Sequence, residues 1–353
     1  MSQLKTNSIT HVDNTGDPNI TLHTDGSTSI RNYKAKSING GPISGFRNQV
    51  MNPTGAIQQR PSGANNSGDY GVDRWRMFTT DGGTAGAMSR QNTSPNGVIA
   101  GVPPEYIAIG RNPGNTATGF VLIQGIEEWT RFMGKTYTLS WLDASDAGFN
   151  DFVQVLFSSN GTSAGAGNEF GDVGASAANY VNEGTVEGWT QYSVTLNIPT
   201  LSEADYNTMA GSSNACLLVK FGSNTGIAES NYGRYTAIQL EPGPLRTPLE
   251  LRFAATELAM CQRYYQVVRA GIRNDYASGQ AAAFGGPFNF FQPMRITPPF
   301  VTKVAEEARQ NVTQEAVVNV SANGAMMEAV GIATDGGQVA QQWVADFGFD
   351  AEL

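Results

Sequence analysis

Short runs in which apolar and polar residues alternate constrain the fold of this chain more than any other feature. Tyr137, Leu139 and Trp141 alternate with Thr138 and Ser140. The same period of two recurs over residues 192–198, 215–221, 316–321 and 343–349, and residues 235–240 are predicted as a further strand. Successive side chains of a strand point to opposite faces, so this period predicts strands. Many such strands separated by turn residues indicate an antiparallel sandwich rather than a fold of alternating strands and helices.

One stretch has a different period and predicts a short helix. Within residues 247–266, Leu258, Cys261 and Tyr264/Tyr265 recur at the spacing of one helical face. Thr256 is the predicted N-cap of this helix. Strand-rich sequence lies on both sides, so we expect the helix to join two β-domains.

Length and composition agree with an all-β protein. A chain of 353 residues is long enough for two domains that each bury a core. Its 41 glycines and its 15% of charged residues are typical of a turn-rich, weakly charged protein. We therefore expect an N-terminal segment over residues 1–45 and then two jelly-roll-like β-sandwich domains. The first would span residues 46–253, and a short helix with the second would span residues 254–353.

The segment 1–45 contains only very short alternating runs, in which Leu4, Ile9 and Val12 recur before a second group at Ile20 and Leu22. Strands this short bury too little area to be stable alone. We expect them to pair with identical strands of other chains or with a partner protein. A disordered tail is the alternative, but recurring Ile and Leu are unusual for one.

Charge and motif content argue against several classes of partner. The net charge of -9, with no run of Lys or Arg, disfavours nucleic acid and anionic membranes. No apolar run reaches the ~18 residues that a bilayer span needs. The N-terminus lacks the apolar region of a secretory signal, so we expect synthesis in the cytoplasm. Cys216 and Cys261 are then expected as reduced, buried thiols.

Catalytic motifs are missing from both expected domains. The two histidines, His11 and His23, lie in the N-terminal segment, so neither main domain holds a histidine-dependent triad. The cysteine spacing does not match a zinc site, and no phosphate-binding glycine motif occurs. We expect no cofactor.

Carboxylates are the remaining candidates for chemistry. Glycoside hydrolysis needs two carboxyl groups facing each other across the scissile bond. The groups that could supply them are Glu127 with Glu128, Asp143 with Asp146 and Asp151, Glu169 with Asp172, and Glu306 with Glu307. Acidic loop residues are ordinarily solvated, and we predict no catalytic residue. Calcium bound by Asp13, Asn14 and Asp17, or by Asp143 and Asp146, stays an open alternative to Asx turns.

The aromatic residues divide into expected core and expected surface. Trp75, Trp141 and Trp343 lie in alternating runs and are predicted to be core residues. Long Gly- and Ser-rich stretches at 81–101, 158–183 and 223–232 are predicted as loops, which are binding surfaces or disordered. The loops at 158–183 and 223–232 are the predicted recognition surface. Sugars are held by aromatic faces together with a few polar groups. The predicted glycan-binding residues are Phe149, Phe170, Tyr180 and Tyr232.

Four patches of sequence share a pattern that goes beyond periodicity. They are the N-P-x-x-x-I-x-Q-R run from Asn52 with Y-x-x-D-R-W from Tyr70, the run MGKTYTLSW at 133–141, the run TP-x-E-x-R…ELA-x-CQRYYQ at 247–266, and the ending FGFDAEL. In this order and spacing they resemble bacteriophage tail-fibre and virion-appendage proteins. The resemblance implies a carbohydrate-binding-like jelly roll, a helical joint and a second β-domain. Residues 1–45 resemble the attachment region of such fibres.

The resemblance implies a structural virion protein, a fibre or spike, that recognises a host-surface glycan non-covalently and is not an enzyme. A capsid decoration or head-fibre protein is one alternative, and a polysaccharide depolymerase spike is another. The implied partners are further copies of the chain, with a trimer expected, and a tail or capsid protein bound through residues 1–45. The implied location is the virion, on a tail appendage or the capsid surface.

Overall fold

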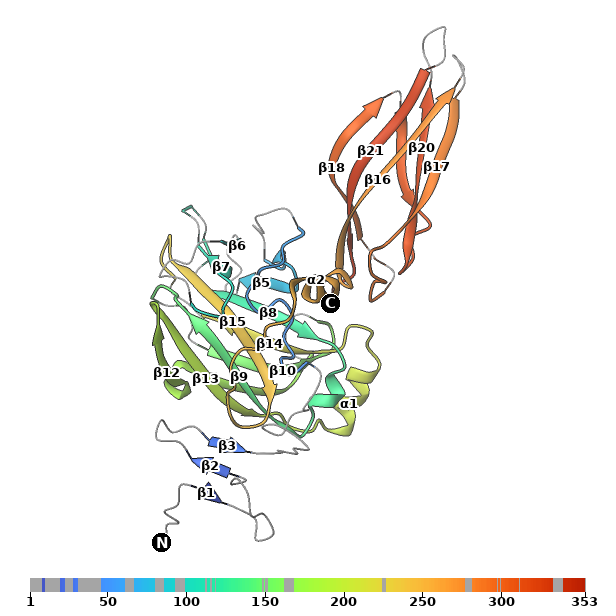
Figure 1. The fold of residues 1–353 in the computed structure, drawn as a ribbon. Helices are drawn as coiled ribbons and strands as arrows, with labels where there is room; N and C mark the ends of the chain where they lie inside the picture. The colour runs from blue at the N-terminus through green and yellow to red at the C-terminus, as the bar shows by residue number, and fades with distance from the viewer. Residues whose placement is uncertain are drawn as a thin grey trace. The chain divides into compact units, whose positions relative to one another are not determined.

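The structure is a computed structural model of this chain (Figure 1). It describes residues 8–9, 20–22, 28–30, 46–60, 67–79, 86–92, 99–111, 113–114, 116–117, 119–147, 149, 152–161, 168–223, 227–276, 281–296, 298, 300–310, 312–332 and 339–352. The chain divides into two compact units, Met1–Gly45 and Phe46–Leu353. The predicted domain boundary at residues 253/254 stays a prediction.

The first unit contains one small antiparallel sheet with the strand order β1-β2-β3. Its strands are β1 (Ser8–Ile9), β2 (Ile20–Leu22) and β3 (Thr28–Ile30). In register, Ile9 pairs with Ile20, which also pairs with Ile30. The expectation of very short strands is confirmed at these positions, whereas Leu4, Val12, both histidines and the calcium candidates Asp13, Asn14 and Asp17 lie outside the described residues.

The second unit begins with a sandwich of two six-stranded antiparallel sheets (Figure 1). One sheet has the strand order β11-β10-β14-β8-β5-β4, and the other has the order β12-β13-β9-β15-β7-β6. The strands are β4 (Tyr70–Val72), β5 (Trp75–Thr79), β6 (Ala87–Gln91), β7 (Tyr106–Gly110), β8 (Phe120–Ile126), β9 (Thr136–Asp143), β10 (Phe152–Ser158), β11 (Glu169–Ser176), β12 (Val181–Val186), β13 (Trp189–Asn197), β14 (Cys216–Gly222) and β15 (Tyr232–Pro242).

Both sheets contribute side chains to one apolar core. Trp75 and Phe221 enter it from the first sheet, and Trp141 and Tyr235 enter it from the second. The rings of Trp141 and Phe221 meet across the sandwich with centroids 5.4 Å apart. Trp75 and Trp141 are fully buried, so their predicted core role is confirmed. The predicted all-β sandwich fold is also confirmed.

Two of the predicted loops contain strands instead. The stretch 158–183 holds β11 and the start of β12, and the stretch 81–101 holds β6. β11 pairs along its length with β10, so backbone hydrogen bonds of an edge strand sustain it despite its glycines. Gly171 has a φ of 59° and marks an irregularity in that pairing, which only glycine accommodates easily. The loop prediction was therefore wrong for these residues.

Among the described residues of the second unit, two short stretches are α-helical. The first, α1 (Glu203–Ala210), was not predicted, because only Met209 on it is buried and no apolar period results. Ser202 caps it, since its Oγ accepts a hydrogen bond from the Asp205 amide at 3.2 Å. Two 3₁₀ turns are also present, η1 (Trp129–Phe132) and η2 (Ala177–Asn179).

The predicted joining helix is α2 (Ala254–Gln262), but its cap is not Thr256. Phe253 occupies the N-cap position and makes no side-chain cap bond, while Thr256 lies inside the first turn. The helix forms without that cap because buried contacts secure it: Glu257 and Cys261 are buried on it, and Tyr264 follows it in the core.

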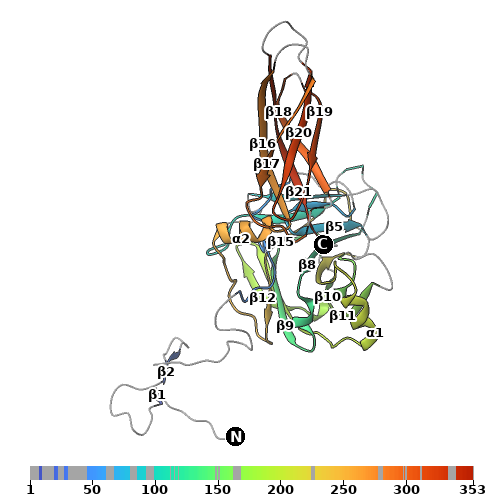
Figure 2. The ribbon, with the colours of Figure 1, turned by 90° about the vertical axis from the view of Figure 1, so that its right-hand side faces the viewer.

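The chain ends in a second, smaller sandwich of two three-stranded sheets, β16-β21-β18 and β17-β20-β19 (Figure 2). Its strands are β16 (Tyr265–Tyr276), β17 (Ala281–Asn289), β18 (Phe300–Gln310), β19 (Val312–Val318), β20 (Gly324–Ile332) and β21 (Val339–Asp350). Trp343 is 1% exposed in its core, as predicted. Residues 294–296 lie outside any strand.

Candidate functional site

Three of the four predicted glycan-binding aromatics pack against the core of the first sandwich. Phe149 is only 7% exposed, and its ring stacks on Phe120 with centroids 6.1 Å apart. Phe170 and Tyr180 are half-buried against the same core. The Tyr180 ring meets Trp141 edge-on at 4.9 Å. The buried face of Phe149 leaves it little to offer a ligand, and the role of the other two remains a prediction.

The fourth aromatic, Tyr232, lines a hollow of about 370 Å³ on the outer face of strands β6, β7 and β15. The lining residues are Ala87, Ser89, Gln91, Tyr106, Ala108, Tyr232 and Arg234. We call this feature the sheet-face hollow. The structure does not place Phe149, Phe170 or Tyr180 in its lining. Its volume lies in the range of small-molecule sites, which is roughly 300–1,000 Å³.

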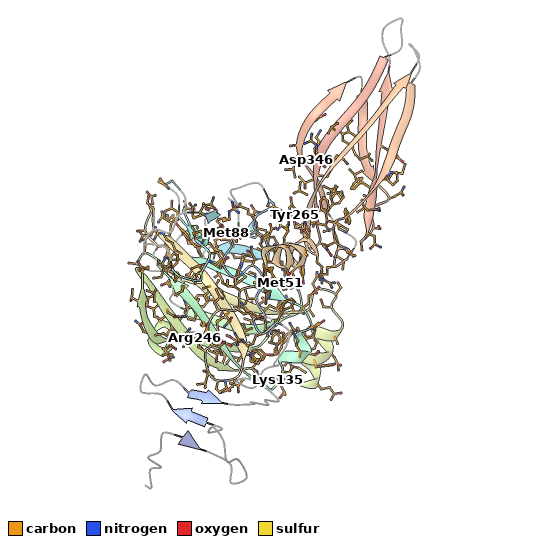
Figure 3. The ribbon with its side chains drawn as sticks, in the orientation of Figure 1. Met51, Met88, Lys135, Arg246, Tyr265 and Asp346 are labelled. Atoms are coloured by element: carbon orange, nitrogen blue, oxygen red, sulfur yellow. The ribbon has the colours of Figure 1, made fainter. Side chains whose placement is uncertain are left out.

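Strand alternation places these side chains together on one face. Met88, labelled in Figure 3, is fully buried in the core between Ala87 and Ser89. Its neighbours in sequence therefore face outward. The register then aligns the three strands: Ser89 pairs with Ala108, which pairs with Arg234. The hollow is thus built by three segments that are far apart in the sequence.

Because Gly110 has no side chain, the Tyr232 ring of β15 can lie across the neighbouring strand β7. The two residues are paired in register. A Cβ atom added to Gly110 would stand 2.4 Å from Tyr232 Cδ1 and 3.0 Å from Cε1, closer than atoms can approach. The ring therefore covers the Gly110 backbone on one side while Tyr232 lines the hollow. An aromatic ring fixed in this way offers a flat apolar platform to a ligand.

Arg234 is held by one carboxylate and one backbone carbonyl oxygen. Its Nη1 lies 2.8 Å from Asp146 Oδ1 and donates to Ala144 O at 3.2 Å. Burial raises the pKa of Tyr106, and a hydrogen bond with Arg234 opposes this shift only in part. The Tyr106 hydroxyl therefore stays protonated at physiological pH and serves as a neutral polar group.

The hollow is lined by groups that can exchange hydrogen bonds with a polyhydroxyl ligand. Tyr232 supplies a ring, while Ser89, Gln91 and Arg234 supply hydroxyl, amide and guanidinium groups. Gln91 Nε2 donates to Ser89 Oγ at 2.8 Å, which orients both side chains. None of the described residues that line the hollow carries a carboxylate.

The carboxylates considered for hydrolysis have other partners. Glu127 pairs with Arg295 at 2.5 Å, and Glu169 pairs with Lys220 at 2.7 Å. Asp172 Oδ2 accepts from Gln154 Nε2 at 3.0 Å. The more exposed members, Glu128 and Glu306, pair with Arg131 and Lys303. Asp151 and the side chain of Glu307 lie outside the described residues.

Asp143 and Asp146, the alternative calcium ligands, both accept hydrogen bonds. Asp143 Oδ1 accepts from the Ser145 amide at 3.2 Å, which is an Asx turn. Asp146 Oδ2 accepts from the Tyr232 amide at 2.9 Å. Over the part of the chain that the structure describes, no three His, Cys, Asp or Glu side chains gather as a metal site would require.

Burial also makes the thiols of the two cysteines unreactive. Both are buried and free. Burial raises the pKa of the Cys216 thiol to about 12 and that of Cys261 well above its ordinary value. A thiol that stays protonated is a poor nucleophile and metal ligand.

Most of the sequence patches that carry the phage resemblance meet at the junction of the two sandwiches. The Asn52 amide donates to Glu257 Oε1 at 2.5 Å, and Trp75 Nε1 donates to Asn52 O at 2.9 Å. Asn52 Nδ2 also donates to Asp73 O at 2.9 Å. Arg252 Nη1 completes this group with Glu257 Oε2 at 3.1 Å.

The ending of the chain closes the same junction. Arg60 Nη2 lies 3.1 Å from Asp350 Oδ2, and its Nη1 lies 3.3 Å from Glu352 Oε1. Arg74 also pairs with Glu352. The Arg60 guanidinium lies 3.9 Å from the ring centroid of Tyr265, which Figure 3 labels beside the second sandwich. We call Arg60, Asp73, Arg74, Asp350 and Glu352 the junction cluster.

The junction cluster and the sheet-face hollow share no residue. The patches that meet at the junction supply contacts that join the two sandwiches. Ser89, Gln91, Tyr106 and Arg234 were missed in the sequence, since three separate strands supply them and β6 fell within an expected loop. The alternation of polar residues around apolar Met88 was the signal in the sequence that could have indicated strand β6 and its outward face.

Comparison with protein-family models finds no match, and neither does comparison with curated proteins. Among solved structures, the chain is similar to the enzymatically active domain of tailspike protein 4 of bacteriophage CBA120, with 13% identity and a TM-score of 0.34. The match covers 61% of this chain and 24% of that domain. Weak structural neighbours thus include a phage tailspike domain.

Two further neighbours have similar scores. The arabinose-bound α-L-arabinofuranosidase MgGH51 shares 13% identity at a TM-score of 0.34, over 64% of this chain and 31% of that one. A putative sugar-binding protein from Bacteroides thetaiotaomicron shares 12% identity at a TM-score of 0.33, over 55% and 99%. The chain spans less than a third of the length of the tailspike domain and of the arabinofuranosidase. Scores this low support no conclusion about function, which is argued below from the chain's own residues.

No helix among the described residues is both long enough and apolar enough to cross a membrane.

Proposed function

We propose that this chain is a structural virion protein of a bacteriophage, a fibre or spike, that binds a host-surface glycan without cleaving it. Two independent features support the proposal. The four resembling sequence patches run from Asn52 to the end of the chain. The sheet-face hollow combines an aromatic platform with hydroxyl, amide and guanidinium groups.

The observation that carries the proposal is the position of Tyr232 over Gly110. A ring held flat on a rigid sheet loses little conformational entropy when a sugar stacks on it. Ser89 and Gln91 stand at the same face to exchange hydrogen bonds with sugar hydroxyls. Strands position these groups more firmly than loops do. This site replaces the loop surface at 158–183 as the favoured recognition site.

Binding without cleavage is supported by the partners of the carboxylates. A glycosidase needs one carboxylic acid with a raised pKa and a second carboxylate facing it. Glu127, Glu128, Glu169 and Glu306 each pair with a Lys or Arg side chain. These ion pairs engage the four carboxylates with cations of the same chain rather than with a second carboxylate across a scissile bond.

A shallow site in each chain suffices when several copies act together. A single site of millimolar affinity contributes only about 4 kcal/mol. Linked copies can raise the avidity by ~10² or more with no new contact. We propose that residues 1–45 supply this linkage by forming a homotrimer and attaching it to a tail or capsid protein of the virion.

The test is adsorption of the labelled full-length protein to bacterial cells, with purified surface polysaccharide of the same cells as competitor. We expect saturable binding that the polysaccharide abolishes and polysaccharide chains that keep their length after incubation. Shortened chains, lost in a Glu169→Gln or Asp172→Asn variant, would favour a depolymerase. If the protein adsorbs to none of the bacterial strains that are hosts of the phage, the receptor role is contradicted and a decoration protein is favoured.

A further inference from the structure

The charge of the sheet-face hollow restricts its ligand. Of the described residues that line it, Arg234 alone carries a charged side chain. Its guanidinium is already bound to Asp146 at 2.8 Å, so the pair carries no net charge. A compensated cation attracts an incoming anion weakly, because the carboxylate beside it repels the same anion.

Asp146 keeps its charge under mildly acidic conditions. Burial alone would raise its pKa, but hydrogen bonds from Arg234 and from the Tyr232 amide, with the charge of Arg234, lower the pKa below its ordinary value. Arg234 is therefore compensated throughout the pH range in which a virion meets its host.

The neighbouring charged side chains on the same strands and loops do not change this balance. Arg111 pairs with Glu229 at 3.6 Å and donates to Ile227 O. Arg90 donates to Ala56 O at 2.8 Å. Asp143 accepts from Ser145. None of these side chains lines the hollow.

We infer that the sheet-face hollow binds a neutral sugar, which stacks on Tyr232 and exchanges hydrogen bonds with Ser89, Gln91 and Arg234. This inference rests on the proposed function and narrows its ligand to one class. Sialic and uronic acid residues are excluded as primary ligands, since their carboxylate would lose water and gain no free cation. The neutral amide and hydroxyl groups lose no charge solvation and match sugar hydroxyls.

The experiment uses the full-length protein and two immobilised panels. One contains neutral oligomers of glucose, galactose, mannose and N-acetylglucosamine, and the other contains oligogalacturonate and sialyllactose. We expect binding to at least one neutral oligomer. Tyr232→Ala should weaken it by roughly tenfold, equal to about 1.4 kcal/mol. The matched control is Tyr206→Ala, which removes a tyrosine that is 40% exposed on α1 and outside the hollow. That variant should bind like the unchanged protein.

The outcomes separate this inference from the proposed function. Binding to the acidic panel alone overturns the neutral class but keeps glycan recognition. Neutral binding that Tyr232→Ala leaves unchanged overturns the site and keeps the function. Failure to bind both panels and the host polysaccharide of the adsorption test overturns both.

A second variant tests the role of Asp146 directly. Asp146→Asn keeps an oxygen that can accept from the Tyr232 amide and removes the charge that compensates Arg234. It should raise affinity for oligogalacturonate by at least about threefold at low ionic strength, and added salt should reverse this gain. An unchanged affinity for the acidic panel would contradict the argument that compensation excludes anions.

Discussion

At the scale of single residues, burial decides which groups are charged. Asp73 is fully buried beside Arg60, with 3.6 Å between Oδ1 and Nη1. Its carboxylate also accepts from the Gln59 side chain at 2.7 Å. Burial raises the pKa of Asp73 from 3.8 to about 6, although Arg60 and Gln59 oppose the shift. The removal of water therefore outweighs the nearby cation at this position.

The sign of the resulting pH dependence follows from linkage. The folded protein holds the Asp73 proton up to about pH 6, whereas the unfolded chain releases it near 3.8. The stability from this proton is full below 3.8 and is lost as the pH rises to about 6. Between pH 5 and 7.5 the wild-type protein should lose roughly 1 kcal/mol relative to Asp73→Asn. Urea unfolding of both proteins at the two pH values measures this difference. An equal change of unfolding free energy with pH in the two proteins would contradict the prediction.

Truncation of two aromatic residues of the first sandwich should lower the unfolding free energy by different amounts. Trp141 is fully buried against Phe221 and Tyr180, so Trp141→Ala should cost about 3–5 kcal/mol of unfolding free energy. Tyr232 lies at the hollow and is half-buried, so Tyr232→Ala should cost clearly less and act mainly on glycan binding. Urea titrations compare them. A larger loss for Tyr232→Ala would show that its ring supports the sheet rather than the ligand.

At the scale of elements, strands with a strict period of two were predictable, and those with glycines were not. β9, β13 and β21 appear where alternation placed them. β14 shows the limit of this signal: all seven of its residues are buried, so the alternation did not separate core from solvent. β11 and β12 were missed, because edge strands depend on backbone pairing with a neighbour that no local pattern reveals.

The candidate site was predictable only in part for the same reason. The sequence predicts Tyr232 as a ligand-binding residue because it is an aromatic residue in a Gly- and Ser-rich stretch, and Tyr232 does line the hollow. Its partners Ser89, Tyr106 and Arg234 come from three strands whose register is a property of the folded sheet. A polar residue on a strand carries no sign of which face is hollow.

The end of β21 gives an element-scale prediction about the junction cluster. Glu352 is 3% exposed and pairs with Arg60 and Arg74. Glu352→Ala leaves both guanidinium groups buried with one carboxylate fewer, which should cost about 3–5 kcal/mol. Glu128→Ala is the control, since that carboxylate is 77% exposed beside Arg131 and should cost at most about 1 kcal/mol. Thermal unfolding measures both. Equal small losses would mean that the ending does not fasten the two sandwiches.

At the scale of the whole molecule, the two units differ in the interactions that stabilise them. The second unit has extensive apolar cores in both sandwiches. The described residues of the first unit form three strands of two or three residues, aligned through Ile9, Ile20 and Ile30. A sheet this small is marginal by itself in water. Pairing with identical units would give it the further strands that stability requires, since closed homo-oligomers are the commonest assemblies of soluble chains.

This difference predicts a homo-oligomer that depends on residues 1–45. Light scattering during size-exclusion chromatography should give the full-length protein a mass of several times 37.6 kDa, with a trimer expected. A chain shortened to residues 46–353 should elute as a monomer and keep the unfolding transition of its sandwiches, since the second unit is compact without the first. The shortened chain should also lose avidity for cells while keeping the weak binding of a single hollow. A full-length protein that stays monomeric at micromolar concentration would contradict the oligomer. A shortened chain that stays trimeric would instead place the subunit contact on the second unit.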